Sequence, residues 1–287
     1  MKILPEAQWD GLVKVLFGEQ GTVLLLGATD SGKTTLARYI IESLVARGRR
    51  AALIDSDIGQ SALGLPGTIS MKVFHSETDL RVFGFERMTF LGFTNPARVI
   101  PLTVAMTKRL AGIGRRRAGI AVVDTTGLIS GGPGRALKMA KIKALRPEHI
   151  IAIQREDELE HILSLVEGAG IHRMKASSEA KKRSPSSRSA YRKRKLEGYF
   201  RAGRSEHMLD ASSVEFFYRG RSFRFGDREM KHGEIIGLNR NGDTIALGII
   251  RRIAGTAVSF RSPLRPPEEI NRVVCGDMTM IDNINSA

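Results

Sequence analysis

The sequence predicts an α/β fold, in which a mostly parallel sheet lies between two layers of helices and a smaller β-rich domain follows. Three observations support this prediction. A glycine-rich loop stands between a short apolar run and a helical pattern, further apolar runs alternate with helical segments, and the pattern becomes β-like from residue 209 onward. At 287 residues the chain is long enough for two domains, each with its own core.

Four short apolar runs have the length and continuity of strands that are buried on both faces of a parallel sheet. They cover residues 22–26, 51–54, 120–123 and 150–153. Helical patterns accompany them at residues 34–47, 96–113, 134–145 and 157–167. The first is the clearest, because its apolar residues recur at helical spacing and form one stripe. This alternation predicts a three-layer domain.

The loop between the first strand and the first helix matches the phosphate-loop pattern G-x-x-x-x-G-K-[ST] in full. It consists of Gly27, Ala28, Thr29, Asp30, Ser31, Gly32, Lys33, Thr34 and Thr35. Its glycines let backbone N–H groups face phosphates, and the dipole of the following helix favours anions. Lys33 can reach the β- and γ-phosphates, and the Thr34 hydroxyl can ligate Mg²⁺. The loop is therefore a predicted P-loop that binds a nucleoside triphosphate.

A second group of polar residues follows the predicted strand at 51–54. Asp55, Asp57 and Gln60 stand at the carboxyl end of that strand, where ligands bind in open α/β sheets. An aspartate there can hold Mg²⁺ or accept a proton from an attacking hydroxyl, which suits phosphoryl transfer. The alternative is that these residues cap the turn or helix that follows.

The segment Asp124-Thr125-Thr126-Gly127 also ends a buried strand, so its polar atoms are expected at the same crevice. It resembles the D-x-x-G element with which signal-recognition-type GTPases sense a γ-phosphate. It equally fits a T-x-G turn that clasps a substrate. The sequence has no base reader of the N-K-x-D type, which weakens the GTPase interpretation.

Positive charge concentrates in residues 175–204, where the only acids are Glu179 and Glu197. The cations are Lys175, Lys181, Lys182, Arg183, Arg188, Arg192, Lys193, Arg194, Lys195, Arg201 and Arg204. We expect residues 177–189, broken by Pro185, to be mobile and residues 191–200 to be helical. Arg188 and Arg192 would project from one helical face, as a lid that stabilises a transferring phosphoryl group. The alternatives are a solvated charge run or a patch for phosphate backbones.

The predicted boundary between the two domains follows this lid. Residues 1–205 form the P-loop domain with its lid at about 175–204, and residues 206–287 form the β-rich domain. Strand patterns at 214–225, 235–238 and 244–250 and the hairpin signal Asn241-Gly242 predict a small antiparallel barrel or sandwich.

Composition narrows the classes of function. The formal net charge of +15, from 45 Lys+Arg and 30 Asp+Glu, favours a polyanionic partner, with nucleic acid as the first choice. The single cysteine, Cys275, excludes an intramolecular disulfide and a cysteine-rich zinc site, and its neighbours predict a buried side chain. No secretory signal or apolar stretch of spanning length occurs, so we expect a cytoplasmic protein without a membrane partner. Trp9 is expected to anchor the N-terminal arm, with stacking on a base as the alternative.

Taken together, the motifs resemble those of the polynucleotide 5'-hydroxyl kinase family. This family includes the kinase subunit of the eukaryotic pre-mRNA cleavage and tRNA-splicing machinery and the nucleolar ribosomal-RNA processing kinase. The resemblance spans about residues 20–205. The motifs that carry it, in order, are residues 27–35, 55–60, 66–70, 92–96 and 125–127, then Arg188 and Arg192, followed by Tyr199-Phe200.

The resemblance implies transfer of the γ-phosphate of ATP, or of another nucleoside triphosphate, to the 5'-hydroxyl end of RNA or DNA. Lys33 would stabilise the phosphates, and Thr34 and Asp55 would hold Mg²⁺. Asp55 would also activate the hydroxyl, with assistance from Asp57, although the roles of the two aspartates remain interchangeable. The acceptor would contact Gln60, Thr94, Thr125, Thr126 and Gly127, and Arg188 and Arg192 would close the lid.

One departure from the family pattern stands at Leu128, where family members usually carry a tryptophan. Stacking by that indole is therefore missing or is supplied elsewhere. Two other functions stay open: a nucleic-acid-binding P-loop ATPase or GTPase switch, and a metabolite kinase, for which the basic lid has no use. The sequence predicts no particular protein partner.

Overall fold

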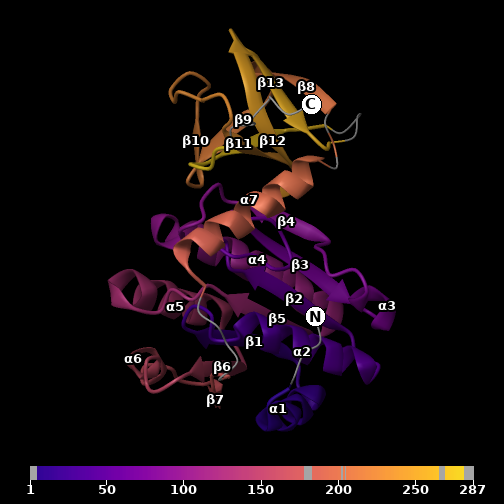
Figure 1. Ribbon diagram of the computed structural model, residues 1–287, viewed down its shortest axis with the longest axis vertical. Coiled ribbons are helices and arrows are strands. Elements are labelled where there is room, and N and C mark those ends of the chain that lie inside the picture. Colours follow the sequence, from indigo (N-terminus) through magenta and orange to yellow (C-terminus); the bar gives the residue numbers. More distant parts are fainter. Residues whose placement is uncertain (1–4, 178–182, 202, 204, 265–268, 281–287) are drawn as a thin grey trace.

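The computed structural model describes residues 5–177, 183–201, 203, 205–264 and 269–280. These residues form two seven-stranded sheets, and helix α7, Pro185–Arg201, lies where the sheets meet (Figure 1). The predicted α/β fold with a second β-rich part is confirmed. The expected boundary between residues 205 and 206 stays a prediction, although the first strand of the second sheet begins at Ser205.

The first sheet contains all four predicted strands. Its strand order is β4-β3-β2-β5-β1-β6-β7, and all neighbours from β2 to β7 run parallel. The strands are β1 Gly21–Gly27, β2 Ala51–Ser56, β3 Thr68–Phe74, β4 Arg87–Phe90, β5 Ile120–Thr125, β6 His149–Gln154 and β7 Gly170–Lys175. Sequence patterns missed β3, β4 and β7. Strand β4 has only four residues, and β7 is a half-exposed edge strand without an apolar run.

Helices cover both faces of this sheet. Helices α1, Ala7–Gly18, and α2, Lys33–Ala46, pack on one face, and α4, Ile100–Ala118, and α5, Gly131–Leu145, pack on the other. Short elements complete the two layers: α3 Glu77–Leu80 lies beside α2, and η1 Pro96–Arg98 and α6 Glu160–Leu163 lie beside α5. Trp9 is 7% exposed, and its ring lies 5.2 Å from that of Tyr39, so it anchors α1 to the core as expected.

The helix predicted at 157–167 is wrong in length, because α6 is a single turn. Side chains compete for the backbone before it. The Glu158 carboxylate accepts hydrogen bonds from the backbone N–H groups of Arg155 and Glu156, each 2.9 Å long at its shortest. These bonds stabilise a turn where the predicted helix would begin. Three buried residues, Leu159, Ile162 and Leu163, still anchor the segment.

The helix predicted at 191–200 begins earlier than expected, and the mobility of residues 177–189 stays a prediction. Residues 178–182 lie outside the described residues, but α7 already begins at Pro185. Proline is tolerated in the first turn of a helix, because its missing N–H has no partner there. The Ser184 hydroxyl accepts a hydrogen bond from the Ser187 N–H at 3.1 Å and caps that turn.

The second sheet has the order β10-β9-β14-β11-β12-β13-β8. Its elements are β8 Ser205–Asp210, η2 Ala211–Ser213, β9 Glu215–Tyr218, β10 Arg221–Phe223, β11 Ile235–Arg240, β12 Asp243–Ala254, β13 Ala257–Ser262 and β14 Arg272–Cys275. The predicted hairpin at Asn241-Gly242 is confirmed, with φ angles of 51° and 85°. The purely antiparallel barrel or sandwich is not, because β14 inserts parallel to β9 and, in the described residues, the order is open at β10 and β8.

The two sheets share a hydrophobic cluster. It consists of Leu65, Met88, Phe90, Leu196, Phe200, Ile235, Leu247 and Ile249. A hydrogen bond from the Phe90 N–H to the Thr244 hydroxyl, 2.8 Å long, fixes β4 against the second sheet. Cys275 is fully buried, as expected.

In the parts of the chain that the structure describes, none of the helices combines the length and the apolar character needed to span a membrane.

Candidate active site

The phosphate loop lies between β1 and α2, and its backbone geometry requires small residues. A Cβ atom at Gly27 would lie 2.7 Å from the Ile153 carbonyl oxygen, and Gly32 has a φ of 94°. Lys33 is 5% exposed, and its ammonium donates to the Ala28 carbonyl at 2.6 Å. Burial lowers the pKa of Lys33, while nearby carboxylates, Asp124 first, raise it. The loop is folded around its lysine, and the contact of Lys33 with the β- and γ-phosphates stays a prediction.

The side chain of Thr34, the predicted magnesium ligand, contacts Asp124, which the sequence analysis placed at the same crevice without naming it as a magnesium ligand. Its hydroxyl donates to Asp124 Oδ2 at 2.6 Å. Asp124 is 2% exposed, and its Oδ1 atom has no hydrogen-bond partner among the described residues. Burial and the charge of Asp55 raise the pKa of Asp124 to about 7. The feature of the sequence that could have identified Asp124 as a ligand is its position near the carboxyl end of β5.

Asp55 is the last residue but one of β2 and lies directly beside Asp124, because the two residues are paired in the register of β2 and β5. Its Oδ2 atom accepts hydrogen bonds from the Ser61 hydroxyl at 2.8 Å and from the N–H groups of Ala62 and Leu63 at 2.7 and 2.9 Å. Its Oδ1 atom accepts one from the Asp57 N–H at 3.1 Å. Burial raises the pKa of Asp55 as well. The carboxylate therefore holds the loop that follows β2.

Asp57 and Gln60 lie on that loop. Asp57 is half-buried, and its Oδ1 atom accepts hydrogen bonds from the N–H groups of Gly59 and Gln60, both at 3.0 Å. This is the capping geometry that the sequence left open as an alternative. The Gln60 amide donates to the Gly59 carbonyl at 2.8 Å and to the Arg188 carbonyl at 3.4 Å. Its Oε1 atom is buried without a partner among the described residues.

The turn after β5 does not present every predicted residue to a ligand. The Thr125 hydroxyl is fully buried, donates to the Leu25 carbonyl at 2.7 Å and accepts from Lys138 at 2.8 Å. It therefore lies inside the domain, and a contact with an acceptor strand does not fit it. Gly127 lies against the phosphate loop, since a Cβ atom there would stand 2.3 Å from Thr29 Cα.

The remaining predicted substrate residues lie near the loop after β2 or the turn after β5. Thr126 is 8% exposed, and Leu128, the departure from the family pattern, is half-buried. Thr94 is half-buried, and a Cβ atom at Gly59 would lie 2.9 Å from its carbonyl oxygen. Thr94 thus borders the loop that carries Asp57.

Two lysines beneath the site were missed. Lys138 and Lys141 of α5 are fully buried, and the Lys141 ammonium donates to the Ser56 hydroxyl at 2.6 Å. Ser56 in turn donates to the Asp124 carbonyl at 2.7 Å. Burial lowers the pKa of Lys138 well below its ordinary value and that of Lys141 to about 8. Their spacing places both lysines on the apolar stripe of α5, and this pattern could have predicted their burial from the sequence.

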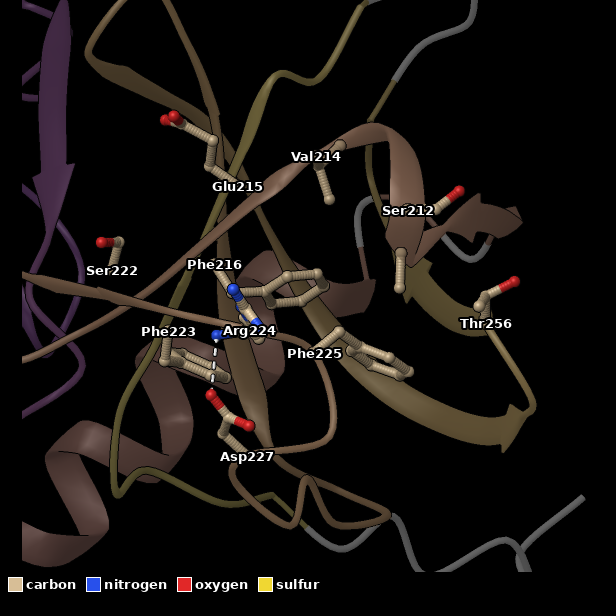
Figure 2. Close-up of a pocket in the computed structure, with 11 residues that line it drawn as sticks. Ser212, Val214, Glu215, Phe216, Ser222, Phe223, Arg224, Phe225, Asp227 and Thr256 are labelled. Atoms are coloured by element: carbon tan, nitrogen blue, oxygen red, sulfur yellow. Dashed lines mark hydrogen bonds between the residues drawn. The ribbon is translucent and has the colours of Figure 1, made fainter.

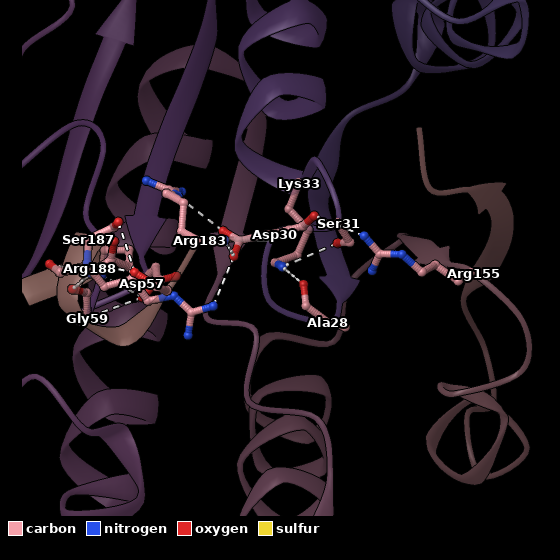
Figure 3. A network of polar contacts seen from close by, with 12 residues as sticks. Ala28, Asp30, Ser31, Lys33, Asp57, Gly59, Arg155, Arg183, Ser187 and Arg188 are labelled. Carbon is pink, nitrogen blue, oxygen red and sulfur yellow. Dashed lines mark hydrogen bonds and ion pairs between the residues drawn. The ribbon is translucent and has the colours of Figure 1, made fainter. Parts of the chain in front are cut away.

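Helix α7 is docked over the phosphate loop through Asp30 (Figure 3). The Asp30 carboxylate accepts hydrogen bonds from the Arg188 guanidinium at 2.9 Å and from the side chain and N–H of Arg183 at 3.2 and 2.8 Å. Burial raises the pKa of Asp30, but these hydrogen bonds hold it below its ordinary value. Asp30 was predicted among the nucleotide-binding residues, and here its side chain serves the lid.

The same helix also contacts the loop after β2. The Tyr191 hydroxyl donates to the Ser61 carbonyl at 2.9 Å, and the Lys195 ammonium donates to the carbonyls of Ser61, Ala62 and Gly64, each at 2.8 Å. Arg188 has a buried Nε atom without a partner among the described residues. Arg192 is half-buried and makes no hydrogen bond or ion pair with them. Of the two predicted lid arginines, only Arg188 is bound at the site.

These features define a P-loop protein in which the phosphate loop, two strand-end aspartates and a basic lid meet at one edge of the sheet. Residues 27–202 match the family described as mRNA cleavage and polyadenylation factor CLP1 P-loop. The match covers more than half of the chain, and the chain belongs to this family.

Several curated relatives share the name polyribonucleotide 5'-hydroxyl-kinase. The polyribonucleotide 5'-hydroxyl-kinase of Pyrococcus horikoshii is 36% identical over 187 residues, which is 64% of this chain and 50% of that protein. The enzyme of the same name from Methanocaldococcus jannaschii is 33% identical over 204 residues, 69% of this chain and 55% of that protein. Clp1 of Xenopus tropicalis is 34% identical over 42% of this chain and 30% of its own length. The chain spans about half the length of the archaeal relatives.

Solved structures support the fold. Wild-type Clp1p in complex with Pcf11p has a TM-score of 0.71 at 12% identity, covering 94% of this chain and 77% of that chain. A Clp1p structure with an extended Pcf11p interface has a TM-score of 0.72 at 11% identity. At this identity the likeness shows the shared fold alone.

Proposed function

We propose that this protein is an ATP-dependent polynucleotide 5'-hydroxyl kinase that acts on RNA. The observation that carries the proposal is the convergence around Lys33 of the phosphate loop, the Asp124 turn, the Asp57 loop and the Arg188 lid. Relatives at 33–37% identity bear the name of this activity. The charge of +15 fits a nucleic-acid substrate better than a small metabolite.

The nucleotide would lie on the phosphate loop, with its phosphates facing the backbone N–H groups and the Lys33 ammonium. Thr34 and Asp124 fit Mg²⁺, because both offer hard oxygen donors and Asp124 Oδ1 is buried without a partner among the described residues. When bound there, Mg²⁺ supplies neutralisation of the charge on the β- and γ-phosphate oxygens. This set replaces the pair Thr34 and Asp55 that the sequence analysis expected.

Asp57 is the better candidate for the general base. It is half-buried, whereas the Asp55 carboxylate already accepts four hydrogen bonds from its own loop. In the reaction the 5'-oxygen bonds to the γ-phosphorus, the bond from that phosphorus to the bridging oxygen breaks, and ADP leaves. The proton of the 5'-hydroxyl passes to the Asp57 carboxylate. Asp55 positions the loop that carries this base.

Arg188 would stabilise the negative charge that develops on the transferring phosphoryl group. Its guanidinium is held beside the phosphate loop by Asp30, and its Nε donor is available for a phosphate oxygen. The matching role for Arg192 stays a prediction, and it requires α7 to bring that side chain toward the site.

The experiment uses ATP labelled at the γ-phosphate, Mg²⁺ and matched RNA and DNA oligonucleotides that end in a 5'-hydroxyl. We expect labelled RNA, no labelling of the same RNA with a 5'-phosphate, and none with Lys33→Ala. Asp57→Asn should retain ATP binding but lower kcat by about a hundredfold or more, the usual contribution of a general base.

Other outcomes would redirect the proposal. Release of free phosphate without labelled oligonucleotide indicates a nucleic-acid-binding ATPase. Preferential labelling of DNA would correct the substrate, and full activity in Asp57→Asn would return the role of base to Asp55.

A further inference from the structure

The β9–β10 hairpin has a composition that the kinase site does not explain. Residues 216–225 read Phe-Phe-Tyr-Arg-Gly-Arg-Ser-Phe-Arg-Phe, a segment rich in aromatic and arginine side chains. The hairpin is tight, because Arg219 and Gly220 have φ angles of 52° and 78° and Tyr218 pairs with Arg221. Strand β10 is an edge of the second sheet, so its outer side has no strand partner among the described residues.

The tip of this hairpin lies against the kinase domain next to the site. The Arg219 guanidinium carbon is 5.5 Å from the centre of the Phe93 ring, and the Tyr218 ring is 5.7 Å from the same ring. A Cβ atom at Gly220 would lie 3.4 Å from Leu102 of α4. Phe93 directly precedes Thr94, which borders the loop of Asp57. The hairpin therefore leads away from the site of phosphoryl transfer.

Three arginines of the hairpin segment carry free positive charge. Arg219, Arg221 and Arg224 are exposed, and none forms an ion pair with a described residue. Neighbouring arginines are neutralised, in the pairs Arg98–Asp277, Arg228–Glu234 and Arg272–Glu215. These three exposed cations lie within one segment of six residues, which favours a chain of phosphates as the ligand.

A pocket of about 640 Å³ lies at the C-terminal end of this segment, and Arg224 is one of the residues that line it (Figure 2). The phenyl rings of Phe216, Phe223 and Phe225 gather there, with centres 5.7 and 5.3 Å apart for the two pairs that include Phe216. The two acids on its rim are already engaged: Glu215 pairs with Arg272, and Asp227 accepts a hydrogen bond from the Arg224 N–H at 3.2 Å. Strand rise places Phe223 about 10 Å from the hairpin tip.

We propose that the β9–β10 hairpin binds the RNA strand that leads away from the reacting 5'-end. Arg219, Arg221 and Arg224 contact successive phosphates, and the phenylalanine pocket receives a base by stacking. The inference rests on the proposed kinase function, and it assigns a substrate-binding role to the second sheet. Aromatic rings and unpaired arginines suit single strands of any sequence, since every base has a face that stacks.

The test compares two double variants that remove the same charge. Arg221→Ala/Arg224→Ala acts on the hairpin, and Arg116→Ala/Arg252→Ala removes two exposed arginines from the far end of α4 and from β12. Binding of a fluorescent single-stranded RNA dodecamer is measured by anisotropy without nucleotide, over a series of salt concentrations. The hairpin variant should bind about tenfold more weakly, and its salt slope should fall by about 1.4, or about 0.7 for each lost phosphate contact.

Two further measurements test the strand path and the pocket. The advantage of the dodecamer over a dinucleotide substrate, as a ratio of kcat/KM, should shrink about tenfold in the hairpin variant but not in the control. Phe223→Leu keeps an apolar side chain and removes the ring, so dodecamer binding should weaken about tenfold while the salt slope stays that of the wild type.

The proposal is overturned if both double variants match in affinity, salt slope and length dependence. A surface for a protein partner would give that result. Because binding is measured without ATP, loss of binding only in the hairpin variant supports the inference even if no RNA is phosphorylated, which would count against the kinase function alone.

Discussion

Asp55 and Asp124 occupy equivalent places, yet their surroundings differ. Both are the last residue but one of a strand in the first sheet, both are 2% exposed, and they are register partners across β2 and β5. The Asp55 carboxylate accepts four hydrogen bonds from the loop that follows it. Asp124 accepts one from Thr34, and its second oxygen has no partner among the described residues.

This difference separates a structural carboxylate from one that is available to a ligand. A buried charge is costly unless its hydrogen bonds are satisfied, and Asp55 satisfies them within its own loop. Asp124 keeps an unsatisfied oxygen beside the Thr34 hydroxyl and near the Lys33 ammonium. Equal burial at equal strand positions therefore does not imply equal function.

The largest expected effect is on catalysis by Asp124→Asn. The change removes the charge that would hold Mg²⁺ and should lower kcat about a thousandfold, or about 4 kcal/mol of transition-state stabilisation. The free energy of unfolding at pH 8 should not fall, because the variant relieves a buried carboxylate next to Asp55. Kinase assays and urea unfolding measure the two quantities.

The control for this variant is Asp157→Asn, which changes an exposed aspartate whose side chain makes no hydrogen bond with a described residue. It should alter neither quantity. An Asp124→Asn protein with nearly normal kcat would show that the unsatisfied oxygen has no part in catalysis.

The contrast also marks the limit of prediction from the sequence. The phosphate loop, four strands and the Asn241-Gly242 hairpin carry local patterns, and the structure confirms them. Whether an aspartate is satisfied depends on groups that fold back on it, such as Ser61, or approach from another element, such as Thr34. No local pattern contains that information.

The second sheet shows the same limit in its topology. The segment of β14 is short and was not predicted, yet its insertion between β9 and β11 makes the sheet mixed and moves the hairpin to an edge. The buried lysines are a different case, because their spacing on α5 beside Leu137 is a local pattern that places them on the buried face. They were not assigned to the core because lysine is charged.

A smaller effect, on stability, is expected from Asp55→Asn. The amide nitrogen cannot accept hydrogen bonds, so donors among Ser61, Ala62 and Leu63 lose their partner in a buried place. We expect a loss of about 3 kcal/mol in the free energy of unfolding. Urea unfolding of Asp55→Asn beside Asp124→Asn measures it, and equal stability of the two variants would remove the distinction between the carboxylates.

The smallest effect is a pH dependence that belongs to Asp124. Its pKa is raised to about 7 from an ordinary 3.8. Below pH 3.8 both the folded and the unfolded chain hold the proton, so burial of this carboxyl does not lower the free energy of unfolding there. Between these values the unfolded chain releases the proton while the folded chain keeps it, and the free energy of unfolding falls as the pH rises.

This decline in the free energy of unfolding should be on the order of 1 to 2 kcal/mol for Asp124. The rest of the pH dependence belongs to Asp55, because the two neighbouring carboxyls titrate together. Unfolding with EDTA present, from pH 4 to pH 7, should show a steeper fall for the wild type than for Asp124→Asn. Asp157→Asn should follow the wild type, because its carboxylate is exposed. Parallel curves for wild type and Asp124→Asn would mean that the buried oxygen of Asp124 is solvated in solution, and the contrast with Asp55 would then rest on hydrogen bonding alone.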